Sequence, residues 1–179
     1  LFRSESLGWN ERAGQQIRFK ILLGIGDLTA HSVLDAGCGH GDLFEYLIER
    51  FPQPEYYGVE QMPGILQVAL DRHSHHPGAH FFEGDFSAAE LPVADYVIAC
   101  GSLNYRSSDD RYVLKTIEKL FNNSRIGFGF NLLHTIEPAH ALICAYDPAY
   151  IMEFCRTLTS RVNLTENYYR EDYTVFMYH

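Results

Sequence analysis

Basic residues are scarce in this sequence. Lysine and arginine together number 14, against 23 aspartates and glutamates in 179 residues, which gives a net charge of −9. No segment is rich in lysine or arginine. Because nucleic acids and anionic membranes bind clustered basic side chains, this balance argues against a general nucleic-acid-binding surface. No apolar run approaches the ~18 residues of a membrane-spanning helix, so we expect no membrane partner.

Cysteine is also sparse. The four cysteines, Cys38, Cys100, Cys144 and Cys155, lie far apart and show no C-x-x-C spacing. This arrangement indicates neither a zinc ribbon nor a redox pair. Free thiols suit a reducing compartment, and the N-terminus lacks the long apolar core of a signal peptide. We therefore expect a cytoplasmic protein.

One histidine cluster invites a metal-site interpretation. His73, His75 and His76 are followed by Pro77 and Gly78, where a helix is expected to end. No carboxylate or cysteine stands at ligand spacing beside them. We favour a solvated loop here over a metal site, and we predict no bound metal.

Strand-like and helix-like segments alternate along the chain. The apolar or β-rich stretches predict strands at 32–35, 56–60, 79–82, 93–100, 126–133, 162–164 and 173–178. Apolar residues at helical spacing predict helices near 12–25, 42–51, 63–69, 110–120 and 148–158. The last two strands are joined without a helix, so they should form an antiparallel pair. The prediction is one α/β domain over 1–179: an open, mostly parallel seven-stranded sheet with helices on both faces and a C-terminal antiparallel hairpin.

The most informative segment runs from Val33 to Asp42. An apolar strand ends at Asp35, and Gly37, Gly39 and Gly41 follow at every second position. Glycine lets the chain turn sharply and lie against a ligand, and the next helix presents unpaired N–H groups there. A dinucleotide fingerprint has the spacing G-x-G-x-x-G, but here Asp42 takes the place of the third glycine.

Two acidic residues follow later strands in the expected order. Glu60 ends the second strand, 19 residues after Gly41, near the ~20-residue offset at which an acid meets ribose hydroxyls. Asp85 ends the third strand and precedes Phe86. A carboxylate there accepts hydrogen bonds from the exocyclic amine of a nucleotide base, while an aromatic neighbour packs against that base. The alternative for each acid is a solvated turn.

The glycine segment with these acids resembles class I S-adenosylmethionine (SAM)-dependent methyltransferases along most of the chain. The resemblance implies SAM as cofactor and S-adenosylhomocysteine (SAH) as product. It places the methionine part beside the glycine turn and the methyl group near the end of the fourth strand. The residues that it assigns to the cofactor are Asp35, Gly37, Cys38, Gly39, Gly41, Glu60, Gln61, Met62, Asp85, Phe86, Cys100, Gly101 and Ser102.

A narrower resemblance involves the first residues. Leu7-Gly8-Trp9 with Arg18, and the strand Phe130-Asn131-Leu132-Leu133, are similar to small bacterial methyltransferase-like proteins of uncertain substrate. That likeness implies a helical cap over the cofactor at 1–30, with Trp9 and Arg18 closing over it. Arg18 would pair with the cofactor's carboxylate through its guanidinium fork. The alternative is an ordinary surface arginine on an amphipathic helix.

Two residues are candidates for removing a proton from the methyl acceptor. Tyr105 follows the fourth strand and His134 follows the fifth. The alternative for Tyr105 is an aromatic wall, and the alternative for His134 is an ordinary hydrogen bond within a loop. Residues 134–145 are expected to form a lid or an acceptor-binding loop.

The leading hypothesis is a SAM-dependent methyltransferase acting on an unidentified small molecule. Methyltransferases that act on exocyclic amines of DNA carry an Asn/Asp-Pro-Pro-aromatic tetrad after the fourth strand, whereas this chain has Gly101-Ser102-Leu103-Asn104-Tyr105. The first alternative is a non-catalytic SAM- or SAH-binding module, serving as a sensor or a partner subunit. A nicotinamide-dependent oxidoreductase is a third hypothesis, which the glycine spacing disfavours.

Overall fold

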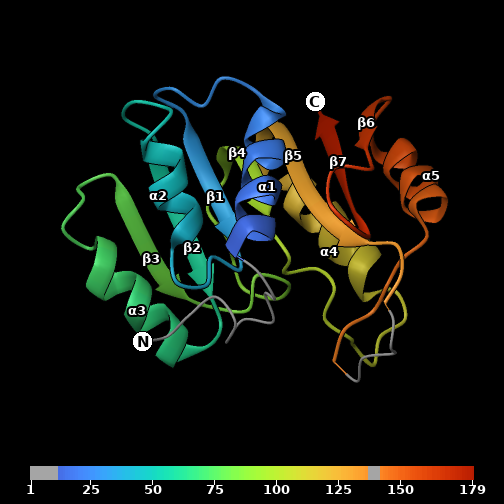
Figure 1. The fold of residues 1–179 in the computed structure, drawn as a ribbon, viewed down its shortest axis with the longest axis horizontal. Helices are drawn as coiled ribbons and strands as arrows, with labels where there is room; N and C mark the ends of the chain where they lie inside the picture. Colours follow the sequence, from blue (N-terminus) through green and yellow to red (C-terminus); the bar gives the residue numbers. More distant parts are fainter. Residues whose placement is uncertain (1–11, 137–141) are drawn as a thin grey trace.

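A single seven-stranded sheet forms the centre of the structure, a computed structural model that describes residues 12–136 and 142–179. The strand order is β3-β2-β1-β4-β5-β7-β6 (Figure 1). The strands are β1 (Ser32–Ala36), β2 (Glu55–Glu60), β3 (Ala79–Glu83), β4 (Ala94–Ala99), β5 (Ser124–Leu133), β6 (Arg161–Thr165) and β7 (Asp172–Tyr178). The helices are α1 (Arg12–Leu22), a 3-10 turn η2 (Leu23–Ile25), α2 (Asp42–Ile48), α3 (Pro63–His73), α4 (Tyr112–Asn122) and α5 (Pro148–Leu158).

Five neighbouring strands are parallel, and β7 of the C-terminal hairpin runs in the opposite direction. β1 lies between β2 and β4, so Asp35 pairs with Gly58 on one side and with Ile98 on the other. β7 runs antiparallel to both β5 and β6, with Asn131 opposite Thr174. The predicted mostly parallel sheet and terminal hairpin are confirmed.

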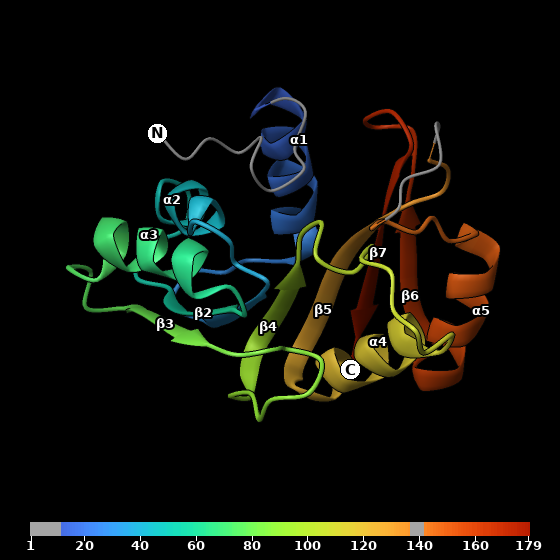
Figure 2. The same cartoon turned by 90° about the horizontal axis from the view of Figure 1, so that it is seen from below.

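Helices cover both faces of the sheet, as Figure 2 shows. Alternate strand residues therefore enter different cores: Val33 belongs to the core that includes α1 and α2, whereas Leu34 belongs to the core that includes α4 and α5. β4 shows the same division, with Ile98 on the α1 side and Val97 on the α4 side. Strands buried on both faces need nearly continuous apolar sequence, which explains the runs that predicted them.

Helix starts agree with the sequence at some positions and differ at others. Asp147 caps α5 by accepting a 2.8 Å hydrogen bond from Ala149 N. Ser107, Ser108, Asp109 and Asp110 are of the types that often cap helices, but α4 begins at Tyr112 after an Arg111 that makes no side-chain cap bond. Asp109 accepts instead from Arg111 N at 2.9 Å and forms a turn before the helix.

The solvated-loop interpretation is wrong for His73. The residue is buried at the end of α3, where its ring stacks on Phe81 with centroids 5.8 Å apart. Burial lowers the pKa of His73, which favours the neutral imidazole. His75 is exposed, as predicted.

Among the helices of residues 12–136 and 142–179, none is long and apolar enough to cross a membrane.

Candidate active site

The glycine turn between β1 and α2 has left-handed backbone at all three glycines. φ is +85° at Gly37, +57° at Gly39 and +77° at Gly41. A Cβ at Gly37 would lie 2.6 Å from Ser102 Cβ, and one at Gly41 would lie 2.6 Å from the His73 ring. The turn therefore requires glycine for its dihedral angles and for its closeness to the end of β4.

Asp35, the acid that precedes this turn, is deeply buried at 2% exposure. Its Oδ2 accepts a 2.5 Å hydrogen bond from the Tyr56 hydroxyl. Within the described residues, Oδ1 has no hydrogen-bond partner. Burial raises the pKa of Asp35 to about 7, although the Tyr56 hydrogen bond acts in the opposite direction.

A small cavity lies at this position. Its volume is about 30 Å3, and it is enclosed by the β1 turn, the end of β4 and helix α1. The lining residues are Gln15, Phe19, Asp35, Gly37, Cys38, Gly39, Asp42, Leu43 and Cys100. A buried carboxylate oxygen without a partner is costly, so a cationic or hydrogen-bond-donating ligand group at this cavity suits Asp35.

Glu60 ends β2 beside the turn and is 8% exposed. Its Oε2 accepts from Gly39 N at 3.2 Å, and its Oε1 accepts from Met62 N at 2.9 Å. An ionised carboxylate offers about four acceptor positions, so two backbone bonds leave room for two more donors. That capacity matches a pair of vicinal hydroxyls.

The residues predicted for the base occupy different environments. Asp85 is exposed, and its Oδ1 accepts from the backbone N and the hydroxyl of Ser87 at 2.8 and 2.7 Å. Phe86 is buried in the core, 3.3 Å from a Cβ placed on Gly37, so its ring supports the turn from within. Met62, 54% exposed before α3, is an apolar side chain open to solvent at this edge.

The segment after β4 is bound to the glycine turn and to β5. Ser102 donates a 2.6 Å hydrogen bond from Oγ to Ala36 O. Gly101 has φ +69° and donates its N–H to Asn131 Oδ1 at 2.8 Å. Burial raises the pKa of the neighbouring Cys100 thiol, which stays protonated. The predicted methyl-transfer residues are therefore rigidly placed next to the turn.

The fork of Arg18 binds a protein carboxylate. Nε donates to Asp172 Oδ1 at 2.8 Å, and Nη2 lies 2.7 Å from Asp172 Oδ2. The sequence analysis directed this fork at the cofactor's carboxylate, and that role stays a prediction beside the observed bond to Asp172. Asp172 lies 154 residues further along the chain, and the antiparallel β7 brings it to the same sheet edge as the end of β5.

The two proton-acceptor candidates lie in exposed positions. Tyr105 is 46% exposed and forms an isolated bridge with Ile143. Partial burial and the charge of Glu60 raise the pKa of its phenol, so Tyr105 stays protonated near neutral pH. His134 is exposed, and its Nδ1 lies 2.8 Å from the Thr135 hydroxyl.

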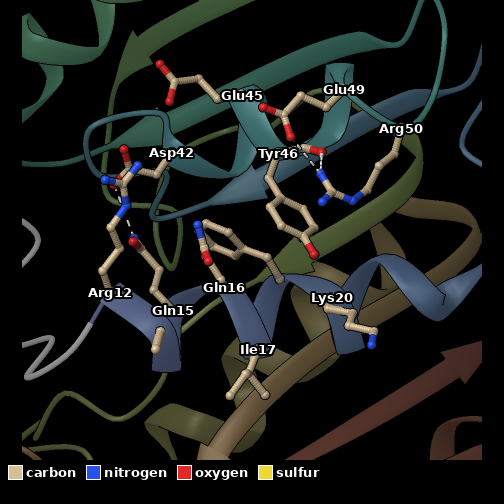
Figure 3. A pocket seen from close by; sticks show the side chains of 12 residues that line it. Arg12, Gln15, Gln16, Ile17, Lys20, Asp42, Glu45, Tyr46, Glu49 and Arg50 are labelled. Carbon is tan, nitrogen blue, oxygen red and sulfur yellow. Dashed lines mark hydrogen bonds and ion pairs between the residues drawn. The ribbon is translucent and has the colours of Figure 1, made fainter.

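A second, larger cavity of about 440 Å3 lies between α1 and α2 (Figure 3). It shares Gln15, Phe19 and Asp42 with the small cavity, so these side chains separate the two spaces. Gln15 donates from Nε2 to Asp42 Oδ2 at 3.1 Å. Helix α1 thus stands directly over the start of α2.

The comparisons with known proteins agree with this geometry. The family described as "Methyltransferase domain" matches residues 33–123. "Putative methyltransferase Rv1506c" of Mycobacterium tuberculosis is 30% identical over 156 residues, which cover 82% of this chain and 92% of that protein. The chain belongs to the methyltransferase domain family. Its sheet order and fold are those of class I methyltransferases, for which SAM is the methyl donor.

Two further likenesses have a narrower meaning. Trans-aconitate 2-methyltransferase of Rhodopseudomonas palustris is 35% identical over 66 residues, which cover 37% of this chain and 25% of that enzyme. Magnesium protoporphyrin IX methyltransferase from Synechocystis, solved with bound SAH, has a TM-score of 0.71 at 16% identity and covers 91% of this chain and 82% of that one. This second likeness shows the shared fold. The family assignment decides against the oxidoreductase hypothesis.

Several residues that surround the candidate site were not assigned to it in the sequence analysis. Gln15 is buried within α1, and Tyr56 holds Asp35 from the adjacent strand. Asn131 and Asp172 bind each other, with Asn131 Nδ2 donating to Asp172 Oδ1 at 3.0 Å. A glutamine on the apolar side of a helix is a usable signal, because a buried amide needs a partner. Of the remaining predicted residues, Gln61 is exposed, and Trp9 lies outside the described residues.

Proposed function

We propose that this methyltransferase binds SAM at the carboxyl ends of β1, β2 and β4 and transfers its methyl group to a small-molecule acceptor. The observation that carries the proposal is the pair of buried carboxylates, Asp35 and Glu60, on either side of a glycine turn with left-handed backbone. Ligands of open α/β sheets bind at such strand ends, where the order of strands reverses. Here the reversal lies between β1 and β4.

Each carboxylate suits a different part of the cofactor. Glu60 has acceptor capacity beyond Gly39 and Met62, which supports a role in holding the ribose hydroxyls. Asp35 faces the small cavity with an unpartnered oxygen, which supports a role near the cofactor's ammonium group. Exposed Met62 and Asp85 border the position proposed for adenine.

The bound cofactor supplies an electrophilic methyl carbon. The chain then has to orient the acceptor in line with that carbon. Orientation of this kind lowers an activation barrier by roughly 7–11 kcal/mol. Gly101 and Ser102 are fixed by hydrogen bonds to Asn131 and Ala36. We assign Tyr105, which follows β4 and is 46% exposed, to hydrogen-bond donation toward the acceptor, since a phenol with a pKa of ~10 or above is protonated at neutral pH.

The small-molecule acceptor rests on two supports. The sequence carries a net charge of −9, which disfavours nucleic acid as a substrate. The partial relative from Rhodopseudomonas palustris is named for trans-aconitate, a small molecule.

Four free cysteines, three of them buried, support the proposed cytoplasmic location.

Isothermal titration calorimetry with SAM and with SAH tests the cofactor site, with NAD as the control ligand. We expect SAM and SAH to bind and NAD to give no heat. No binding of SAM at millimolar concentration would reject the proposal. SAH release after incubation with SAM and a fractionated metabolite extract tests the transfer. SAM binding without transfer to any fraction would favour the non-catalytic binding module.

A further inference from the structure

A chain of buried polar groups connects α1 to the segment after β4. Arg18 on α1 donates from Nε to Asp172 Oδ1 at 2.8 Å, and its Nη2 forms an ion pair of 2.7 Å with Oδ2. Asp172 Oδ1 also accepts from Asn131 Nδ2 at 3.0 Å. Asn131 Oδ1 in turn accepts the Gly101 N–H at 2.8 Å. Four residues from distant parts of the sequence thus form one continuous path.

The centre of this path is sealed from solvent. Asp172 is 1% exposed and Asn131 is 2% exposed. A buried carboxylate is tolerated only when a cation and hydrogen-bond donors compensate its charge. Asn131 has a single amide, whose orientation is set on one side by Asp172 and on the other by Gly101. Removing Arg18 therefore disturbs the carboxylate, and through it the amide that holds Gly101.

Both ends of the path lie at the proposed cofactor site. On the α1 side, Gln15 binds Asp42 and Phe19 lines the cavity at the glycine turn. On the other side, Gly101 has left-handed backbone directly before Ser102, which is bonded to Ala36. The hairpin turn adds a contact, since the Tyr169 ring lies 2.6 Å from a Cβ built on Gly14.

We propose that Asp172 is a positioning residue that couples the placement of α1 over the glycine turn to the backbone of Gly101. Arg18 acts through Asp172 and Asn131 and has no direct contact with Gly101 among the hydrogen bonds of the described chain. The consequence for the cofactor rests on the proposed function. The coupling itself is a property of the protein without ligand.

Amide hydrogen exchange at Gly101, followed by two-dimensional NMR of the unliganded protein, measures the coupling. We expect Arg18→Ala to speed Gly101 exchange by about tenfold or more, the effect of losing a hydrogen bond of ordinary strength. Arg18→Lys keeps the charge but loses the fork, so we expect a smaller acceleration in the same direction. Should Arg18→Ala not fold, Arg18→Lys decides the question. An unchanged Gly101 amide in the folded variants overturns the proposal.

Asp95→Asn is the matched control. Asp95 is a carboxylate that joins β4 to β1 by accepting from the Ser32 N and Oγ, both at 2.9 Å, at the opposite end of these strands. We expect this variant to lower stability without changing Gly101 exchange relative to its neighbours. If Asp95→Asn accelerates Gly101 as much as Arg18→Ala does, the effect is general loosening and the proposal fails.

Calorimetry with SAH then tests whether the coupling reaches the cofactor. We expect Arg18→Ala to weaken SAH binding by about tenfold, while Asp95→Asn binds like the unaltered chain. Equal affinity in Arg18→Ala and the unaltered chain would overturn the positioning role. If the unaltered chain fails to bind SAH, the proposed function fails, and the NMR result still decides whether Arg18 and Gly101 are coupled.

Discussion

The Tyr56 hydroxyl donates a 2.5 Å hydrogen bond to Asp35 Oδ2 across two adjacent parallel strands. This bond lowers the pKa of the carboxyl, but burial outweighs it and leaves a pKa of about 7. Asp35 therefore changes its charge near neutral pH, directly beneath the glycine turn. Two of the predictions below follow from this titration.

The first concerns stability. The folded protein holds the Asp35 proton up to a pKa of about 7, whereas the unfolded chain loses it near pH 4. The folded state thus binds more protons between these values, so this carboxyl makes the free energy of unfolding fall as pH rises through that window. We expect urea denaturation of Asp35→Asn to show a shallower decline than the unaltered chain. Identical pH profiles would show that Asp35 is ionised when buried.

The second concerns cofactor affinity. An ionised Asp35 attracts the ammonium group of SAH, so binding and proton loss are coupled. We expect affinity to fall about tenfold for each pH unit below the pKa of Asp35. Tyr56→Phe removes the bond that lowers this pKa, so it should move the inflection to higher pH. Calorimetry across pH, with Asp35→Asn as a flat reference, provides the measurement.

Glu60 and Glu83 form a matched pair for testing the ribose site. They are register partners at the ends of β2 and β3, but Glu60 is buried against the glycine turn and Glu83 is exposed. Glu60→Gln places an amide where two backbone N–H groups need an acceptor. We expect it to weaken SAH binding about 10- to 100-fold, the range for charge-assisted hydrogen bonds. Glu83→Gln should bind normally; equal losses in both would remove Glu60 from the site.

Gly37 and Gly64 provide a test of the turn itself. A Cβ at Gly37 meets Ser102 at 2.6 Å on a backbone with φ +85°, whereas one at Gly64 has nothing within 4 Å. We expect Gly37→Ala to destabilise the fold by about 1–3 kcal/mol. Gly64→Ala should leave stability unchanged or raise it by about 0.4–1 kcal/mol, because alanine restricts the unfolded chain. Thermal denaturation distinguishes them, and equal effects would contradict the packing at Gly37.

Local sequence signals predicted the local structure well. Apolar and β-rich stretches predicted the strands, and apolar residues at helical spacing predicted α5 over 148–158. The glycine spacing predicted the turn between β1 and α2, because the left-handed backbone there requires glycine at three closely spaced positions. Such features depend on contacts within a few positions of the chain, which is why one sequence suffices for them.

Features that depend on distant contacts were not predicted. The partner of Arg18 is 154 residues away, and the residues next to either one in the sequence do not indicate the contact. Phe86 follows a strand, where the alternation of inward and outward side chains no longer applies, and it proved to be buried under Gly37. Burial of His73 likewise depends on Phe81, contributed by the following strand.

The bond between Arg18 and Asp172 has a consequence for how the two ends of the described fold depend on each other. Helix α1 and its carboxylate partner are 154 residues apart in the sequence, so most of the described fold is formed by the residues between them. Loss of β7 would therefore remove the carboxylate that binds α1 from the other side of the fold. A chain truncated before Asp172 should be more readily cleaved by protease within α1.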